Sequence, residues 1–126
     1  MPNTVIIPDS KQLTLIAWPY RKDNRNVKSA PWKMGKMTPA GGVYSNIKDL
    51  SNLLLAQMKA YQAKVVDTFG VRYGHGGELD GYASDYVFMP HQGLGIILLT
   101  SSGGRWFGEL GKEIRVYIIK NRKSYQ

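Results

Sequence analysis

The chain has 126 residues, of which 43% are hydrophobic and 21% are charged, and its length is typical of a single globular domain. Every apolar run is far shorter than the ~20 residues that a membrane-spanning helix needs, so no membrane span is expected. The absence of cysteine excludes disulfides, zinc–thiolate sites and a cysteine nucleophile, and two histidines argue against a histidine-rich metal site. No cofactor is therefore expected.

The first residues have neither the basic region nor the apolar region of a secretory signal. Such a signal is either absent or was carried by sequence upstream of Met1. The compartment therefore stays open, and it would be periplasmic or secreted if the full-length protein carries a signal peptide.

The net charge of +8 is concentrated in two segments. Their basic residues are Arg21, Lys22, Arg25, Lys28, Lys33 and Lys36 in the first, and Lys112, Arg115, Lys120, Arg122 and Lys123 in the second. Such charge can attract an anionic polymer, or it can keep a loop and the outer face of a helix solvated. The second interpretation is favoured because no known nucleic-acid-binding module is present, so no nucleic-acid partner is expected.

The first 44 residues are expected to be mostly irregular, because prolines and charged clusters interrupt any long periodicity, and only residues 12–18 are typical of a short element. A helix is expected next, within residues 45–61, with Ser45 as its N-cap. Its apolar residues recur at helical spacing and are Leu50, Leu53, Leu54, Met58 and Tyr61.

The second half of the chain predicts strands within residues 65–104, at 65–73, 82–89 and 94–100. The turn at 90–93 should join the last two strands into an antiparallel hairpin. The strand at 94–100 hardly alternates, which predicts a central strand that is covered on both faces.

An amphipathic helix is expected at residues 105–121. Its apolar stripe consists of Trp106, Phe107, Leu110, Ile114, Tyr117 and Ile118. Together the elements predict a single α+β domain in which helices flank an antiparallel sheet.

Four segments, in order, resemble the C-terminal portion of the serine hydrolases that include class C β-lactamases, D-alanyl-D-alanine peptidases and related esterases. They are the start of the chain together with AWPY (17–20), PAGGVYSNIKDL (39–50), YGHGGELDGY (73–82) and the hairpin from Pro90 to Thr100. The third segment is similar to the third active-site motif of that family in its His-x-Gly form. The resemblance covers nearly the whole chain and implies a β-lactamase- or transpeptidase-like fold.

The resemblance also implies a chemistry. In the family, a serine with a lysine one helical turn later attacks an amide or ester carbonyl, and the third motif forms the opposite wall of the site. On this chain His75 would be the polar first position of that wall, Gly76 and Gly77 would leave space for the substrate, and the N–H of Glu78 would help to form the oxyanion hole. Because histidine loses its charge near neutral pH, the motif favours esters or peptides over β-lactams that carry a carboxylate. A packed strand histidine is the alternative interpretation of His75.

The Ser-x-x-Lys nucleophile motif of the family is expected upstream of the matched region. Within the chain, Ser45 and Lys48 have that spacing, and Tyr44 to Asn46 fit the family's Tyr-x-Asn pattern. The two patterns share Ser45, whereas acyl transfer needs two separate walls, so a capping role is the preferred interpretation of Ser45. The chain is also shorter than the family between its helix and its third motif, where an insert usually forms part of the substrate-binding rim.

Three hypotheses follow from the sequence. The chain is the C-terminal part of a serine hydrolase that acts on a peptide, ester or other small substrate and is inactive alone. Alternatively, it is a non-catalytic module that binds cell-wall material or another anionic partner, or it is an unstable truncated product. A missing N-terminal segment or a partner chain would complete the domain in the first case.

Overall fold

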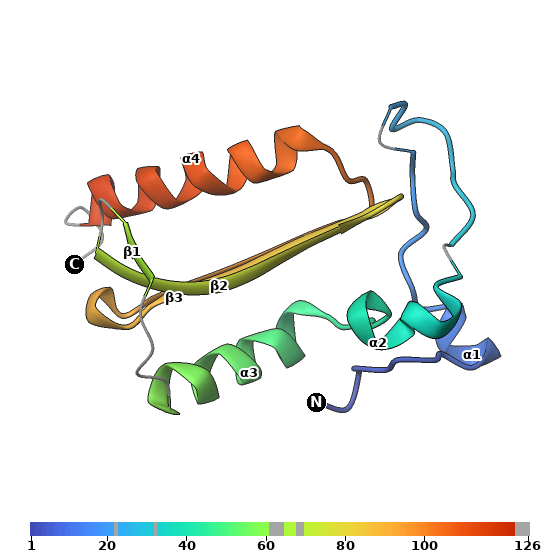
Figure 1. Ribbon diagram of the computed structural model, residues 1–126, viewed down its shortest axis with the longest axis horizontal. Coiled ribbons are helices and arrows are strands. Elements are labelled where there is room, and N and C mark those ends of the chain that lie inside the picture. Colours follow the sequence, from blue (N-terminus) through green and yellow to red (C-terminus); the bar gives the residue numbers. More distant parts are fainter. Residues whose placement is uncertain (22, 32, 61–64, 68–69, 123–126) are drawn as a thin grey trace.

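A four-stranded antiparallel sheet forms the centre of the computed structural model, in the strand order β1-β2-β3-β4 (Figure 1). The strands are β1 (Val65–Asp67), β2 (Gly70–Leu79), β3 (Tyr82–Met89) and β4 (Leu94–Thr100). The structure describes residues 1–21, 23–31, 33–60, 65–67 and 70–122. The predicted strands at 82–89 and 94–100 are confirmed, whereas the strand predicted at 65–73 is two strands, of which the second continues through the Gly-rich segment.

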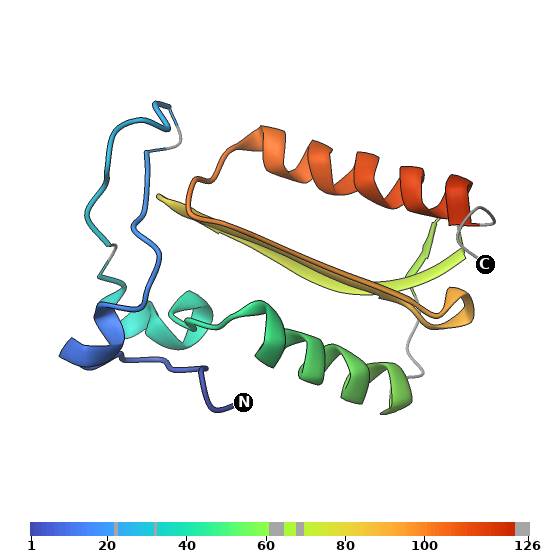
Figure 2. The same ribbon diagram turned by 180° about the vertical axis from the view of Figure 1, so that it is seen from behind.

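Two long helices cover the two faces of the sheet, α3 (Ile47–Ala60) on one and α4 (Arg105–Asn121) on the other (Figures 1 and 2). A short 3-10 turn, η2 (Pro90–Gln92), joins β3 to β4 and ends at Gly93 in the left-handed conformation. The three layers confirm the expected α+β class.

The hairpin between β2 and β3 determines which residues of each strand form backbone hydrogen bonds with which neighbouring strand. Asp80 and Gly81 form its loop, which is closed by the pair Leu79 and Tyr82. A pair that closes a two-residue loop exchanges both backbone hydrogen bonds, and such pairs alternate along an antiparallel ladder. Odd-numbered residues of β2 therefore bond to β3, whereas even-numbered residues direct their backbone N–H and C=O groups to the other side, where Arg72 pairs with Val65 of β1.

The two faces of the sheet carry separate halves of the core, because side chains alternate along a strand. On the face toward α3, Phe88 is buried and Leu54 of the helix packs so closely on Gly95 that a Cβ there would lie 2.5 Å from it. The face toward α4 is lined by the buried apolar residues Ala83, Val87, Met89 and Ile96.

The N-terminal end of α3 differs from the prediction. Asn46 and not Ser45 caps the helix, since the Asn46 side-chain oxygen accepts a 2.9 Å hydrogen bond from the N–H of Asp49. The Ser45 hydroxyl instead lies 2.9 Å from the Thr4 hydroxyl, which donates to Asp49. The predicted end of the helix at Tyr61 lies outside the described residues.

The buried face of α4 is also rotated from the predicted stripe. Phe107 and Gly111 are buried, whereas Leu110 and Tyr117, which were expected in the stripe, are exposed. Gly111 faces the sheet because a Cβ there would lie 2.6 Å from the Asp85 carboxylate. The spacing of apolar residues could not predict this position, because glycine has no apolar side chain and here makes room for a polar one.

The first 44 residues are mostly irregular and contain three short helical turns. These are α1 (Ser10–Leu13), η1 (Gly35–Met37) and α2 (Thr38–Gly41). The short element expected at 12–18 is therefore wrong: the helical turn begins two residues earlier, where Asp9 and Gln12 form a capping box. A bridge between Val5 and Tyr44 and a hydrogen bond from Tyr20 N–H to Ser101 C=O tie the segment to the rest of the fold.

The position of β4 differs from the expectation of a central strand. A helix lies on each of its faces, α3 on one and α4 on the other, but Leu99 is 41% exposed, and among the described strands only β3 pairs with it. A continuous apolar run thus indicates helices on both faces and not a paired strand on each side.

Candidate functional site

The four predicted site residues lie together on β2, at a part of the strand that has a neighbour on one side only among the described strands. His75, Gly76, Gly77 and Glu78 all pair with β3, whereas β1 pairs with β2 only as far as Arg72. Because only the odd-numbered residues of β2 bond to β3, Gly74, Gly76 and Glu78 direct their backbone N–H and C=O groups away from β3. No described strand takes up these groups, so this segment, residues 74–78, is the open edge of β2.

The glycines of the open edge fall into two kinds. A Cβ on Gly74 would lie 2.5 Å from the backbone oxygen of Tyr86, so the packing of β2 on β3 requires a glycine there. On Gly76 or Gly77 a Cβ would meet its nearest atoms, both of Ser84, at 3.4 and 3.5 Å. Neither residue has a positive φ. The described structure therefore gives no conformational or packing reason for glycine at positions 76 and 77.

His75 and Glu78 point to opposite faces of the sheet, since an odd and an even residue of one strand alternate. His75 is exposed on the α3 face, opposite Tyr86 in register. The Glu78 side chain lies against Gly103, the residue before the N-cap of α4, where a Cβ would be 3.0 Å from the Glu78 Cγ. The two side chains cannot converge on one substrate atom, and only the backbone N–H of Glu78 belongs to the open edge.

Aromatic side chains flank His75 on the α3 face. The Tyr73 and Phe88 rings stack with centroids 5.1 Å apart, and the Tyr86 ring meets Phe88 edge to face at 6.2 Å. The Tyr86 hydroxyl donates a hydrogen bond to the Gln57 side chain of α3. Burial raises the pKa of the Tyr86 hydroxyl, so it stays protonated over the usual range of pH.

Ser84 is a hydroxyl residue of this face that sequence reasoning missed. It pairs with Gly77, and its side chain is on the same face as that of His75, two pairs further along the hairpin. The hairpin register would have revealed it, because counting from the Asp80-Gly81 turn places residues 77 and 84 opposite each other. No lysine of β2, β3 or β4 accompanies it, since these strands contain none.

Ser45 and Lys48 are not part of the open edge. The Ser45 hydroxyl is engaged with Thr4, and both lie at the N-terminal end of α3 beside Asp49. Lys48 is exposed. The hydrogen bond between Ser45 and Thr4 joins the N-terminal segment to the helix, which is a structural role.

An apolar groove of about 350 Å³ lies elsewhere, between α3 and β4. It is lined by Ile47, Ser51, Leu54, Leu55, Met58, Gly93, Gly95 and Ile97. None of the four predicted site residues lines it, so the groove and the open edge of β2 are separate features.

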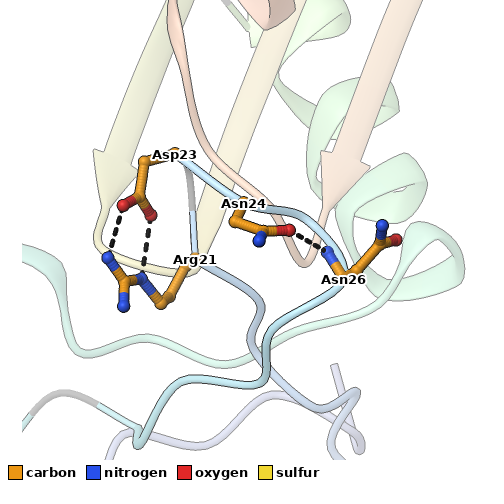
Figure 3. A network of polar contacts seen from close by, with 4 residues as sticks. All are labelled: Arg21, Asp23, Asn24 and Asn26. Carbon is orange, nitrogen blue, oxygen red and sulfur yellow. Dashed lines mark hydrogen bonds and ion pairs between the residues drawn. The ribbon is translucent and has the colours of Figure 1, made fainter.

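The basic N-terminal segment is largely engaged within the chain. Arg21 and Asp23 form a bidentate ion pair in which the Nε to Oδ1 distance is 2.9 Å (Figure 3). Its hydrogen bonds raise the pKa of Arg21 and lower that of Asp23. Arg25 lies 5.1 Å above the Trp106 ring, and Lys28 lies 5.1 Å above Trp18. These contacts leave the net charge of +8 unchanged, because Asp23 is already counted in it and a cation above an aromatic ring keeps its charge.

In the part of the chain that the structure describes, no three His, Cys, Asp or Glu side chains gather so that they could hold a metal ion. Likewise, no helix among the described residues has both the length and the apolar character to cross a membrane. Comparison with known proteins gives no relative: no protein-family model, curated protein or solved structure matches the chain.

Proposed function

We propose that the open edge of β2 is one wall of an acyl-transfer site, and that the chain is the C-terminal part of a serine hydrolase domain of the β-lactamase-related and penicillin-binding family. The sheet with α3 and α4 would then be the corresponding part of a β-lactamase- or transpeptidase-like fold. The observation that carries the proposal is the pair Gly76 and Gly77, for which neither backbone conformation nor packing within the chain explains glycine.

The geometry supports specific roles. An unpaired strand edge offers an extended substrate backbone hydrogen bonds, and glycine at positions 76 and 77 leaves the faces of the sheet beside the edge clear for the substrate's own side groups. The outward N–H of Glu78 would donate to a carbonyl oxygen on which negative charge develops. His75, exposed at the start of the wall, would bind a polar group of the substrate or take part in proton transfer.

The attacking hydroxyl would come from another polypeptide segment. Ser45, the one serine with a lysine three residues later, is engaged with Thr4 away from the edge. The chain alone is therefore expected to be unreactive. In the complete site, the hydroxyl oxygen would attack the substrate carbonyl, the oxyanion would form beside the Glu78 N–H, and the leaving amine or alcohol would depart after protonation.

The first test is covalent labelling of the isolated chain with a fluorescent β-lactam and a fluorophosphonate. No labelling is expected. Labelling that Ser45→Ala abolishes would overturn the assignment of Ser45 as structural, and labelling that Ser84→Ala abolishes would show that the chain carries its own nucleophile.

The second test measures non-covalent binding of an acylated D-alanyl-D-alanine peptide and of a matching peptide ester by amide NMR. We expect shifts concentrated at the outward groups of Gly74, Gly76 and Glu78. Gly76→Pro should weaken them while the pairing with β3 is kept, because proline removes only the outward N–H at this edge position. Absence of shifts along the edge with both ligands would contradict the proposal.

A binding module for anionic cell-wall material is the competing function. The net charge of +8 favours it, and of Arg21, Arg25 and Lys28 only Arg21 is paired with a carboxylate, since the other two keep their charge above aromatic rings. Titration with cell-wall polymer and with nucleic acid at two salt concentrations separates the two functions. Binding that disappears with salt and leaves the β2 amides unshifted would favour the module.

A further inference from the structure

The side chain of Ser84 on β3 points toward Gly77 of the open edge. Its Oγ lies 3.5 Å from the position that a Cβ on Gly77 would take. Apart from the chain neighbours of Gly77, no other heavy atom of the described residues lies within 4 Å of that position. The Ser84 hydroxyl also has no hydrogen-bond partner among the described residues. It is therefore free to bond to a group placed above Gly77.

The two tyrosines beside Ser84 on β3 are already engaged. Tyr82 and Tyr86 share the face of Ser84, because side chains two residues apart in a strand point the same way. The Tyr82 hydroxyl donates a 2.8 Å hydrogen bond to the C=O of Ala17, and the Tyr86 hydroxyl donates to the Gln57 side chain. Burial raises the pKa of both tyrosines. Of these three neighbouring hydroxyls, that of Ser84 is the one available to a ligand.

Gly77 leaves a gap in the row of side chains on this face of β2. This Gly77 gap is bordered by His75 and Leu79 on β2 and by Tyr82, Ser84 and Tyr86 on β3. Side chains on one face of a strand follow one another at about 7 Å, so the gap has the width of one side chain. A side chain that enters it from the open edge meets the Ser84 hydroxyl.

The backbone pairing in the proposed function determines which part of a substrate meets the gap. If an antiparallel substrate accepts a hydrogen bond from the N–H of Glu78, the residue that carries the accepting carbonyl lies opposite Glu78. The next substrate residue then lies opposite Gly77, because the two chains run in opposite directions. Residues directly opposite each other project to the same face. The side chain of the residue after the reacting carbonyl therefore points across Gly77 toward Ser84.

The distance to Ser84 sets the length of that side chain. Cβ positions of opposite residues are about 5 Å apart, and the Ser84 Oγ lies 3.5 Å from the Cβ position of Gly77. With a hydrogen bond of about 2.9 Å, the side chain must extend about 5–6 Å beyond its own Cβ. Lysine has about this reach. Shorter polar side chains would leave the hydroxyl unbonded.

The chemistry around the gap suits an amine. The Ser84 oxygen can accept a hydrogen bond from an ammonium group, and tyrosine side chains on both sides can pack against the methylene groups. His75 is the single ionisable side chain beside the gap on β2, and histidine is ordinarily neutral above pH 7. The side chains on this face of β2 and β3 therefore do not repel a cation at mildly alkaline pH.

We propose that the Gly77 gap, with Ser84 at its end, selects substrates in which the residue after the reacting carbonyl has a long, unbranched side chain that ends in an amine, as in lysine. The proposal rests on the proposed function, because it needs a substrate along the open edge of β2. Ser84 would be the residue that determines specificity, and it would take no part in the acyl transfer.

Amide NMR titration at pH 8 with three capped peptides tests the selection. The peptides are Ala-Lys-Ala, Ala-norleucine-Ala and Ala-Gly-Ala, and norleucine is the matched control because it lacks only the amine of lysine. All three should shift the outward amides of Gly74, Gly76 and Glu78. The lysine peptide should bind at least about threefold more tightly than the norleucine peptide, which is the factor that one hydrogen bond contributes.

Variants of the gap attribute the preference to its residues. Ser84→Ala should bring the ratio of the two affinities to about one without weakening the norleucine peptide, whereas Ser84→Thr keeps the hydroxyl and should retain the preference. Gly77→Ala puts a methyl group in the gap at an ordinary contact distance, so it should weaken the lysine peptide more than the glycine peptide. Ser51→Ala on α3 is the control and should change neither affinity.

The outcomes separate this proposal from the one on which it rests. If the peptides shift the edge amides with equal affinity, or if Ser84→Ala keeps the preference for lysine, the gap does not select the side chain, while the open edge still binds substrate. If none of the peptides shifts the edge amides, the substrate wall and its specificity are both refuted.

Discussion

The Asp85 carboxylate on β3 accepts a 2.5 Å hydrogen bond from the Arg115 guanidinium on α4, at the point where Gly111 leaves room for it. The two side chains are 19% and 14% exposed, so the ion pair lies largely between the sheet and the helix. The ion pair fixes the position of α4 along the strands of the sheet. The loop before the helix is thereby held against the Glu78 side chain.

Removing one partner of this ion pair should destabilise the fold. Asp85→Asn leaves the largely buried Arg115 charge without its counterion, and we expect the free energy of unfolding to fall by about 2 kcal/mol in urea denaturation. Glu109→Gln on the exposed surface of α4 is the matched control and should change it by less than about 0.5 kcal/mol. If Asp85→Ala and Arg115→Ala cost together as much as the sum of their separate costs, the two residues do not interact.

Gly81 should be the least replaceable glycine of the β2–β3 hairpin. Its φ is 91°, and a Cβ would lie 2.5 Å from the Cβ of the buried Pro19. Gly81→Ala therefore adds backbone strain and a steric clash, and we expect it to cost about 2 kcal/mol or more in thermal unfolding.

Gly76→Ala and Gly77→Ala supply the contrast. Both positions have ordinary contact distances for a Cβ, and glycine within a strand costs about 0.5–1 kcal/mol relative to alanine. These variants should be as stable as the natural chain or slightly more stable. A loss of stability equal to that of Gly81→Ala would show that Gly76 and Gly77 have a packing role after all.

The elements of the sheet were predictable because their signals are local. The aromatic residues of 82–89, the continuous apolar run of 94–100 and the turn residues between them predict the two strands and their hairpin. The division of residues 65–79 into two strands was not predictable, since Gly74, Gly76 and Gly77 have low strand propensity and are held there by pairing with β3.

The residues of the candidate site could be predicted from the sequence, but their arrangement in space could not. The sequence identifies His75 to Glu78 as one stretch, whereas the separation of His75 and Glu78 onto opposite faces follows from the strand conformation. Ser84 comes opposite Gly77 only through the hairpin register. The cap of α3 illustrates the same limit, because Ser45 and Asn46 are both good caps and the contact of Ser45 with Thr4 decides between them.

Acid should destabilise the N-terminal end of α3 through Asp49. Desolvation raises the pKa of this carboxyl, but hydrogen bonds from the Asn3 N–H and the Thr4 hydroxyl outweigh it, so the pKa lies below its usual value. A lowered folded-state pKa gives stability that is present above the unfolded value of about 3.9 and is lost as the pH falls through the folded-state pKa.

The measurement is urea denaturation between neutral pH and the acid limit. Asp49→Asn should be less stable than the natural chain at neutral pH, and the difference should shrink as the pH falls below about 4. Asp80→Asn, at an exposed turn, is the control and should follow the natural curve. A constant difference at every pH would mean that the carboxylate charge contributes nothing.

Alkali should weaken the contact between β3 and α3 through Tyr86. Its hydroxyl donates to Gln57, and burial raises its pKa above the usual value of about 10. A raised folded-state pKa means that the associated stability is fully present below about pH 10 and is lost as the pH rises through the folded-state pKa. Tyr86→Phe should cost about 1 kcal/mol at neutral pH by leaving Gln57 without its donor, and it should flatten the alkaline fall in stability. Tyr117→Phe, at an exposed position on α4, tests whether any tyrosine would do the same: if it flattens the curve equally, the alkaline effect does not arise at the sheet face that carries His75.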